Sequence, residues 1–288
     1  MPSLNPRSDF YLSQGLKLHF SEWPNRHGAD MVLVHGMQDH SRTWDALVER
    51  FIADYRVLAP DLRGHGNSAW VKGAAYEMMD YVYDLHQLVL RQAQGPITLI
   101  GHSMGGSIAA LYAGIFPERV SRLVVIEGIG LWRHFMEDNS TLARIRNWVE
   151  HTSMLAARQP KRFASLEDAT NRMQQANPGL DEQRVRHLAQ QGTLRNEDDT
   201  FSWKFDPCTH NFSPWGLTSE EIAEVWQAIT APVLVINAEH GFEHRIGHDN
   251  SLQFFADARL QVIPGAGHWT YHDAEEPVEH SIREFLVG

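Results

Sequence analysis

The chain has 288 residues, of which 43% are hydrophobic, and this length suits one large α/β domain with an insertion. Its formal net charge of -11 argues against a nucleic-acid partner, and its one cysteine, Cys208, excludes a disulfide framework and a cysteine-based metal site. No apolar run approaches the roughly 20 residues of a membrane-spanning helix. The first residues lack the pattern of a signal peptide, so we expect a cytoplasmic protein without a membrane partner.

Apolar runs alternate with amphipathic segments in the first half of the chain. A period-two pattern around the turn at Ser13–Gly15 predicts two short strands over 9–23. Apolar runs predict buried strands over 31–35, 56–59, 96–100 and 120–127. Helical spacing predicts helices over 43–53, 76–94 and 107–113. Because strands alternate with helices, we predict a doubly wound, mostly parallel sheet of eight strands with helices on both faces.

The pattern changes over 130–229, where the strand–helix alternation stops. This stretch is rich in Trp, Phe, Met, Arg and Gln, and we predict a helical cap inserted into the core domain, which comprises 1–129 and 230–288. After the insertion the alternation resumes, with strands predicted over 232–238 and 259–264 and helices over 248–255 and 275–286.

The segment Gly101-His102-Ser103-Met104-Gly105-Gly106 has the pattern G-x-S-x-G. It follows a predicted strand and precedes a predicted helix, which is the context of a nucleophile elbow. Glycines on both sides of Ser103 allow the tight, strained turn that would present its hydroxyl at the edge of the sheet. A serine hydroxyl is a weak nucleophile, so Ser103 needs a base supplied from elsewhere in the chain.

Four motifs follow one another along the chain: His35-Gly36, Asp61-Leu62-Arg63-Gly64-His65-Gly66-x-Ser68, Gly101-x-Ser103-x-Gly105-Gly106 and Gly265-x-Gly267-His268. As a set they resemble the landmarks of the α/β-hydrolase family, of the serine hydrolase-like kind with a helical cap. The resemblance covers nearly the whole chain outside the cap and implies the α/β-hydrolase fold. These motifs are specific for the fold, but only weakly specific for the substrate.

We predict His268 as the base, because it follows the last predicted core strand in a glycine-containing loop that can bend back toward Ser103. The resemblance implies structural roles for His35 and His65, and we give His102 little weight as a catalytic residue. The oxyanion hole needs two backbone N–H groups. One is expected from Met104, the residue after the nucleophile, and the resemblance points to Met37 for the other.

The sequence departs from the family's commonest pattern at the triad acid. A strand that ends in Gly-x-x-Asp usually supplies it, whereas here Gly241 occupies the position of that Asp. Glu127 ends the buried strand 120–127, where a carboxylate is costly unless it is paired. Certain haloalkane dehalogenases take their acid from this strand end. We therefore predict Glu127 as the acid and Glu239 as the second choice, with Glu243 and Asp249 as weaker candidates.

These residues predict a serine hydrolase that uses no cofactor or metal. The first choice of activity is that of a carboxylesterase acting on small to medium esters. Hydrolysis of C–C bonds in vinylogous diketones and lactonase or perhydrolase chemistry could use the same residues. A ligand-binding receptor on this scaffold is the alternative from another class.

The histidines in His240-Gly-Phe-Glu-His244 do not have the helical H-E-x-x-H arrangement of a zinc site. A homodimer is left open.

The aromatic residues of the predicted cap have two interpretations. Trp148, Phe163 and Trp203 can form the cap's own small core, and some of the cap aromatics can face the cleft and select an apolar or aromatic acyl group. The sequence does not separate the two, and the residues that contact the substrate are therefore left open. A cap over the serine predicts a closed cleft that opens and closes during turnover.

Overall fold

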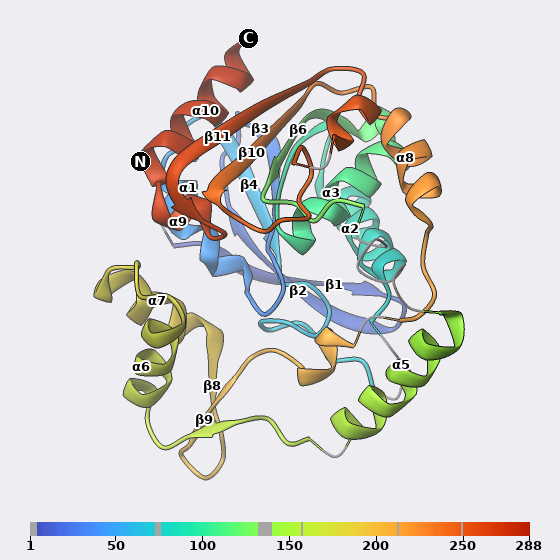
Figure 1. Cartoon of the computed structure of the whole chain (residues 1–288). Helices are drawn as coiled ribbons and strands as arrows, with labels where there is room; N and C mark the ends of the chain where they lie inside the picture. The colour runs from blue at the N-terminus through green and yellow to red at the C-terminus, as the bar shows by residue number, and fades with distance from the viewer. Residues whose placement is uncertain (1–4, 73–75, 132–139, 157, 212, 249) are drawn as a thin grey trace.

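An eight-stranded sheet forms the centre of the molecule, with the strand order β1-β2-β4-β3-β5-β6-β10-β11 (Figure 1). The computed structural model describes residues 5–72, 76–131, 140–156, 158–211, 213–248 and 250–288. The strands are β1 (Arg7–Ser13), β2 (Leu16–Trp23), β3 (Ala29–Val34), β4 (Tyr55–Pro60), β5 (Ile97–His102), β6 (Val120–Ile126), β10 (Val233–His240) and β11 (Ala258–Gly267). β2 runs antiparallel to β1 and β4, and the other neighbouring strands are parallel. The predicted mostly parallel sheet of eight strands is confirmed.

Helices cover both faces of this sheet. The larger core cluster includes α2 (Met78–Gln92), α3 (Met104–Ile115) and α8 (Ser219–Gln227). The second cluster, on the other face, includes α1 (Asp45–Glu49), α9 (Thr270–Asp273) and α10 (Glu275–Val287). Every side chain of β5 is buried, because this central strand has a covered surface on each side. The 3₁₀ turns are η1 (Ser41–Trp44), η2 (Pro117–Arg119), η3 (Pro207–His210) and η4 (Ser251–Phe254).

The chain between β6 and β10 contains strands as well as helices, in contrast to the helical cap expected from the sequence. We call residues 141–210 the cap segment. It contains α5 (Thr141–Ala156), β7 (Arg162–Phe163), α6 (Leu166–Ala176), α7 (Glu182–Gly192), β8 (Thr193–Arg195) and β9 (Phe201–Trp203). Strands β8 and β9 form an antiparallel hairpin around the polar turn at 196–199, and β7 pairs with the other edge of β9. Figure 1 shows these elements on one side of the core, with α6 and α7 at one end and α5 at the other.

Helix α8 lies within the predicted insertion by sequence but packs on the core. The Trp226 ring stacks on Phe255, with 5.2 Å between the ring centroids. A Cβ at Gly114 of α3 would overlap the Val225 backbone, so the two helices are in close contact because position 114 has no side chain. The chain therefore returns to the core domain at α8, before residue 230, where the sequence predicted the end of the insertion.

The predicted helix over 248–255 is reduced to the single turn η4. Asn250 has a left-handed conformation with φ 61° before this turn, and Phe255 is extended after it. These two residues restrict the turn to 251–254. In the described parts of the chain, no helix is both long and apolar enough to cross a membrane.

Candidate active site

Ser103 occupies the sharp turn between β5 and α3. Its backbone has φ 53° and ψ -123°, a conformation that a residue other than glycine rarely adopts. The Ser103 N–H donates to the carbonyl of Ile126 at 2.9 Å, which ties the turn to the end of β6. A Cβ at Gly105 would overlap the carbonyls of Val34 and His35, so this glycine allows α3 to begin against the end of β3. The expected elbow geometry is present at Ser103.

His268 lies directly after β11, and its Nε2 is 3.0 Å from the Ser103 Oγ. The carbonyl of His268 accepts a hydrogen bond from His102 Nε2 at 2.9 Å. Burial, followed by the charge of His268, lowers the pKa of His102 well below its usual 6.5, so His102 stays neutral and can donate through Nε2. His102 therefore supports the loop that carries His268 and does not contact the Ser103 hydroxyl.

Glu127 follows β6 and is completely buried. Its Oε2 lies 3.1 Å from His268 Nδ1, on the side of the ring opposite Ser103. The backbone N–H of Ala238 donates to Oε1 at 2.7 Å, and the N–H of Phe242 donates to Oε2 at 3.2 Å. Glu127 has a positive φ of 49°, so the backbone is strained at the residue that aims this carboxylate. These contacts place Ser103, His268 and Glu127 in one hydrogen-bonded chain.

Arg245 is a site residue that the sequence reasoning missed. It is 6% exposed, and its Nε lies 3.1 Å from Glu127 Oε1, in an ion pair without the alignment of a hydrogen bond. Its Nη2 donates to the Ala238 carbonyl at 2.9 Å, and Nη1 donates to the Phe242 carbonyl. One signal was present in the sequence, because a carboxylate at the end of a buried strand requires a cationic or hydrogen-bonding partner.

Among the described acid candidates, only Glu127 bonds the His268 ring. Glu239 is exposed, and its Oε2 accepts a hydrogen bond from the Gly265 N–H at 2.8 Å. Glu243 is also exposed, and Asp249 lies outside the described residues. A Cβ at Gly241 would overlap the Glu127 carboxylate, so the position of the family's usual acid has no room for a side chain here.

The loop after β3 approaches the nucleophile from the side opposite β6. A Cβ at Gly36 would lie 3.1 Å from the Ser103 Cβ, which places the next residue, Met37, beside the nucleophile. As the first residue of α3, Met104 has an N–H without an intrahelical acceptor. Met104 is 1% exposed and packs in the core, whereas Met37 is partly buried and borders a cavity. Their N–H groups therefore remain our candidates for the oxyanion hole.

The two other histidines near this edge of the sheet bind loop backbone. His35 Nδ1 donates to the Gly36 carbonyl at 2.7 Å, and its Nε2 accepts from the Leu62 N–H at 3.0 Å. His65 Nδ1 donates to the Arg63 carbonyl at 2.9 Å. Burial lowers the pKa of His35, and burial with the nearby His35 lowers that of His65 to about 3. Both side chains are therefore neutral and hold the loops around the site.

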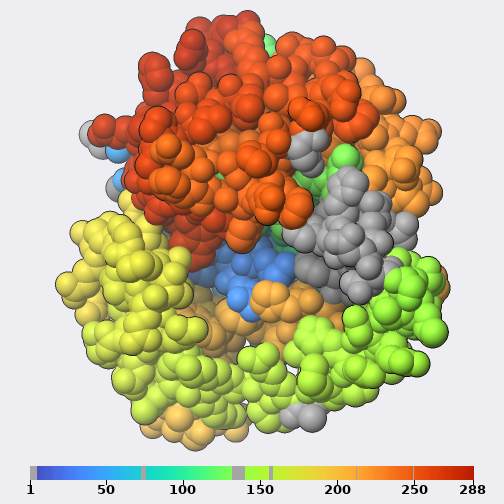
Figure 2. Space-filling view, viewed as in Figure 1, coloured from blue at the N-terminus to red at the C-terminus, as the bar shows by residue number. Residues whose placement is uncertain are grey.

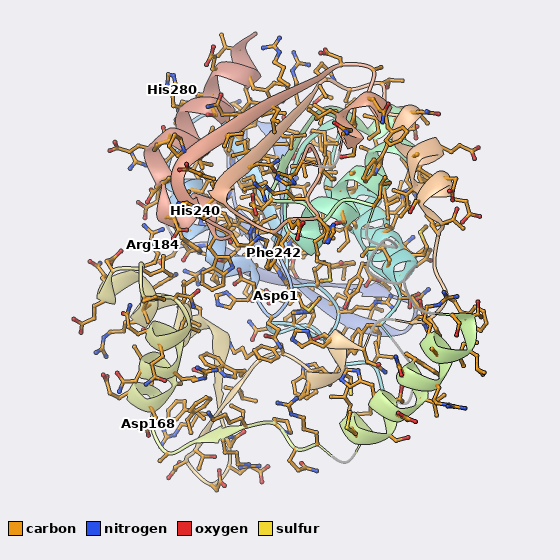
Figure 3. The ribbon with its side chains drawn as sticks, in the orientation of Figure 1. Asp61, Asp168, Arg184, His240, Phe242 and His280 are labelled. Atoms are coloured by element: carbon orange, nitrogen blue, oxygen red, sulfur yellow. The ribbon has the colours of Figure 1, made fainter. Side chains whose placement is uncertain are left out.

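Two adjoining cavities lie between the sheet edge and the cap segment. One, of about 500 Å³, is bordered by Met37 and Trp269, and the other, of about 470 Å³, is bordered by His268 and Trp269. Figure 2 shows the hollow on this face, with blue atoms from early in the chain at its floor between the red-orange C-terminal part and the yellow-green cap segment. Phe242, labelled near the centre of Figure 3, packs its ring 4.0 Å from the His268 ring, centroid to centroid.

The model of the alpha/beta hydrolase fold family matches residues 31–275. The chain belongs to this family. The hydrolase is 25% identical to human serine hydrolase-like protein 2 over 92% of this chain and 88% of the human protein. It is 28% identical to the zebrafish (Danio rerio) serine hydrolase-like protein over 92% of this chain and 83% of that protein. A pimeloyl-[acyl-carrier protein] methyl ester esterase of Nitrosomonas europaea is 26% identical over 84% of this chain and 89% of its own.

Solved structures share the fold of this hydrolase. The thioesterase domain from the curacin biosynthetic pathway superposes with a TM-score of 0.83 at 21% identity, over 96% of this chain and 99% of that domain. E-2-(acetamidomethylene)succinate hydrolase superposes with a TM-score of 0.78 at 20% identity, over 98% of this chain and 100% of that one. At these identities the likeness supports the fold alone.

The cap segment of the hydrolase uses its aromatic residues in both expected ways. Phe163 is 5% exposed and packs edge-on against Trp203, with 5.3 Å between the ring centroids. Trp203 also borders the larger cavity, whereas Trp148 is not among the residues described at its wall.

Cys208 is half-buried, and burial followed by the charge of Asp206 raises the pKa of its thiol. Among the described residues, no group of three or more His, Cys, Asp or Glu side chains could hold a metal ion.

Proposed function

We propose that this chain is a serine hydrolase that cleaves carboxylic esters of small to medium size. The observation that carries the proposal is the continuous hydrogen-bonded chain from Ser103 through His268 to Glu127. His268, which bonds Ser103, borders one of the two cavities, and Glu127 on the other side of the His268 ring is completely buried. The esterase relative from Nitrosomonas europaea adds support for ester chemistry.

The first half of the proposed reaction forms an acyl-enzyme. Ser103 Oγ attacks the ester carbonyl carbon while His268 Nε2 takes the hydroxyl proton. The N–H groups of Met37 and Met104 stabilise the oxyanion of the tetrahedral intermediate. When the intermediate collapses, the C–O bond to the alcohol breaks, and His268 gives its proton to the leaving alcohol.

The second half releases the acid. A water molecule gives a proton to His268 and attacks the acyl carbon, and collapse of the second intermediate returns the proton to Ser103. Glu127 accepts the Nδ1–H of His268, fixes the ring's tautomer and stabilises its charged form. Arg245 and the N–H groups of Ala238 and Phe242 hold the Glu127 carboxylate in this orientation.

The test is the release of p-nitrophenol from a series of p-nitrophenyl esters of increasing acyl length, with Ser103→Ala as the control. We expect multiple turnovers that disappear in the variant, because the variant has lost the attacking oxygen. The preferred acyl length then measures the space that the cavities offer. No turnover of any ester, together with cleavage of a vinylogous diketone, would replace the proposal with C–C bond hydrolysis. Tight binding of an ester without turnover would favour a receptor.

A further inference from the structure

The larger cavity beside the site carries a charge opposite to that of the whole protein. The chain has 36 acidic and 25 basic residues. The described wall of this cavity nevertheless contains Arg158, Lys161 and Arg172, and no Asp or Glu. A hollow lined by one sign of charge concentrates the field within it and attracts ligands of the opposite sign. The polarity of this wall is therefore a property of the site and does not follow from the composition.

In the part of the chain that the structure describes, the three cations have no carboxylate to neutralise them, although Lys161 Nζ lies 5.0 Å from the centroid of the Phe163 ring. Arg158 and Lys161 belong to the segment between α5 and β7, Arg172 belongs to α6, and all three are exposed. The salt bridges described on the same side of the molecule use other cations, Arg162 with Asp198, Arg186 with Glu167 and Arg195 with Asp199. Within the described residues, none of the three cavity cations has a carboxylate partner.

The rest of the wall suits an organic ligand that ends in a charge. Trp203, Phe205 and Trp269 provide aromatic surface for a hydrocarbon chain. The ring of His210 borders the same space, and burial, His151 and the positive charge of Arg158 lower its pKa. His210 is therefore neutral near pH 7 and can donate or accept a hydrogen bond there.

The cavity adjoins the proposed reaction centre. Met37, whose N–H we assign to the oxyanion hole, lies in its wall, and so does Trp269, the residue after the proposed base. It shares Ala176, Asn177 and Trp269 with the neighbouring cavity that reaches His268. An acyl chain whose carbonyl is held at Ser103 can therefore extend into the cationic space.

We propose that the substrates of this hydrolase are esters whose acyl chain ends in an anionic group, a carboxylate or a phosphate, that is bound by Arg158, Lys161 and Arg172. The inference rests on the proposed ester hydrolysis and adds the substrate class. The reaction itself is unchanged: the scissile C–O bond breaks at Ser103, and the anionic end stays bound as a recognition group. Arginine at two of the three positions suits bidentate binding of either anion.

The experiment compares p-nitrophenyl hydrogen adipate with p-nitrophenyl hexanoate, which has the same acyl length without the charge. A third ester, p-nitrophenyl 6-phosphonooxyhexanoate, distinguishes phosphate from carboxylate. We expect kcat/KM for at least one anionic ester to exceed that for the hexanoate by about tenfold or more, since a charge-assisted hydrogen bond contributes about that factor. The advantage should decrease as the salt concentration rises.

Arg172→Gln should raise KM for the preferred anionic ester by about tenfold and change KM for the hexanoate far less. Arg195→Gln is the matched control, because Arg195 belongs to the cap segment but pairs with Asp199 and does not border the cavity. Efficient hydrolysis of hexanoate, with slower hydrolysis of both anionic esters and no effect of Arg172→Gln, would overturn the inference while the hydrolase assignment stands.

Binding separates the inference from the hydrolase assignment. Monomethyl adipate is titrated calorimetrically into Ser103→Ala and into the same variant with Arg172→Gln. If no ester is hydrolysed but binding of monomethyl adipate weakens about tenfold without Arg172, the anion site stands and the ester chemistry fails. If monomethyl adipate binds equally to both variants, or to neither, the anion site is wrong.

Discussion

The carboxylate of Glu127 occupies the space that a side chain at position 241 would need. A Cβ added to Gly241 would overlap both carboxylate oxygens of Glu127. A side chain at position 241, where the family's acid usually lies, and the Glu127 carboxylate are thus mutually exclusive in this structure. A glycine at 241 therefore leaves the space in which Glu127, directly after β6, reaches His268.

Gly241→Ala should displace the Glu127 carboxylate and lower kcat strongly. The added methyl group should also reduce the free energy of unfolding by about 1–3 kcal/mol, the usual effect of overpacking. Steady-state kinetics and urea unfolding test the two effects. Gly95→Ala is the control, because nothing lies within 4 Å of a Cβ at that position. Full activity of Gly241→Ala would show that Glu127 does not depend on this space.

Glu127→Gln should keep the fold and lower kcat by about 10⁴, as expected when a triad acid sets the tautomer of its histidine. The amide has no negative charge to stabilise the protonated ring, and its NH2 group can donate to His268 Nδ1 and favour the wrong tautomer. Glu239→Gln is the matched control and should retain nearly full activity, because Glu239 contacts the Gly265 N–H. The reverse result, an active Glu127→Gln and an inactive Glu239→Gln, would invalidate the assignment of the acid.

Arg245→Gln should destabilise the protein by about 3–5 kcal/mol, because it leaves a buried carboxylate without its cation. It should also lower kcat while KM changes little, since Arg245 contacts Glu127 and borders neither described cavity beside the site. Thermal unfolding and ester kinetics measure both effects, with Arg195→Gln as the exposed control. An unchanged kcat in a folded Arg245→Gln protein would exclude the positioning role.

The stability of the protein should fall on acidification below pH 6.5. Burial lowers the pKa of His40 to about 4 and that of His65 to about 3, whereas the unfolded chain retains the usual 6.5. Between these values the unfolded state binds more protons, so each histidine contributes stability that is lost as pH falls, by up to about 1.4 kcal/mol per pH unit. Urea unfolding at pH 7.5, 6.5, 5.5 and 4.5 checks this.

Asp39 opposes this trend. Burial raises its pKa to about 7, so the folded state binds the additional proton between the ordinary carboxyl value of 3.8 and pH 7, and stability decreases as pH rises through this range. Asp39→Asn should therefore be more stable than the natural chain at pH 7.5 and lose stability more steeply on acidification. A pH profile of Asp39→Asn parallel to that of the natural chain would contradict the assignment to Asp39.

The motifs predicted those parts of the site that depend on local backbone geometry. Ser103 was identified from its flanking glycines and the strand and helix around it, and the structure shows the strained turn. Glu127 was singled out because a carboxylate at the end of a buried strand needs partners and because certain haloalkane dehalogenases take their acid from this strand end. Four groups contact it in the structure. In both cases the sequence indicated a cost in free energy: backbone strain at Ser103 and burial of a carboxylate at Glu127.

Features that depend on how distant segments pack were not predictable in this way. Arg245 belongs to the loop after β10, which pairs with the chain at Ile129, and nothing in its local sequence indicates a contact with Glu127. The packing of α8 on α3 brings together segments about 110 residues apart and includes a close approach at Gly114. The local sequence does not reveal this contact, and the insertion was expected to extend further than the cap segment. The cationic wall combines Arg158, Lys161 and Arg172 from two separate elements.

Labelling with a fluorophosphonate, followed by peptide mapping by mass spectrometry, tests the central claim most directly. The claim is that Ser103 is a nucleophile activated by His268 and Glu127. We predict one covalent label per chain, on the peptide that contains Ser103, with labelling slowed strongly in Glu127→Gln and abolished in Ser103→Ala. A label on another residue, or equal labelling of the natural chain and Ser103→Ala, would contradict the account.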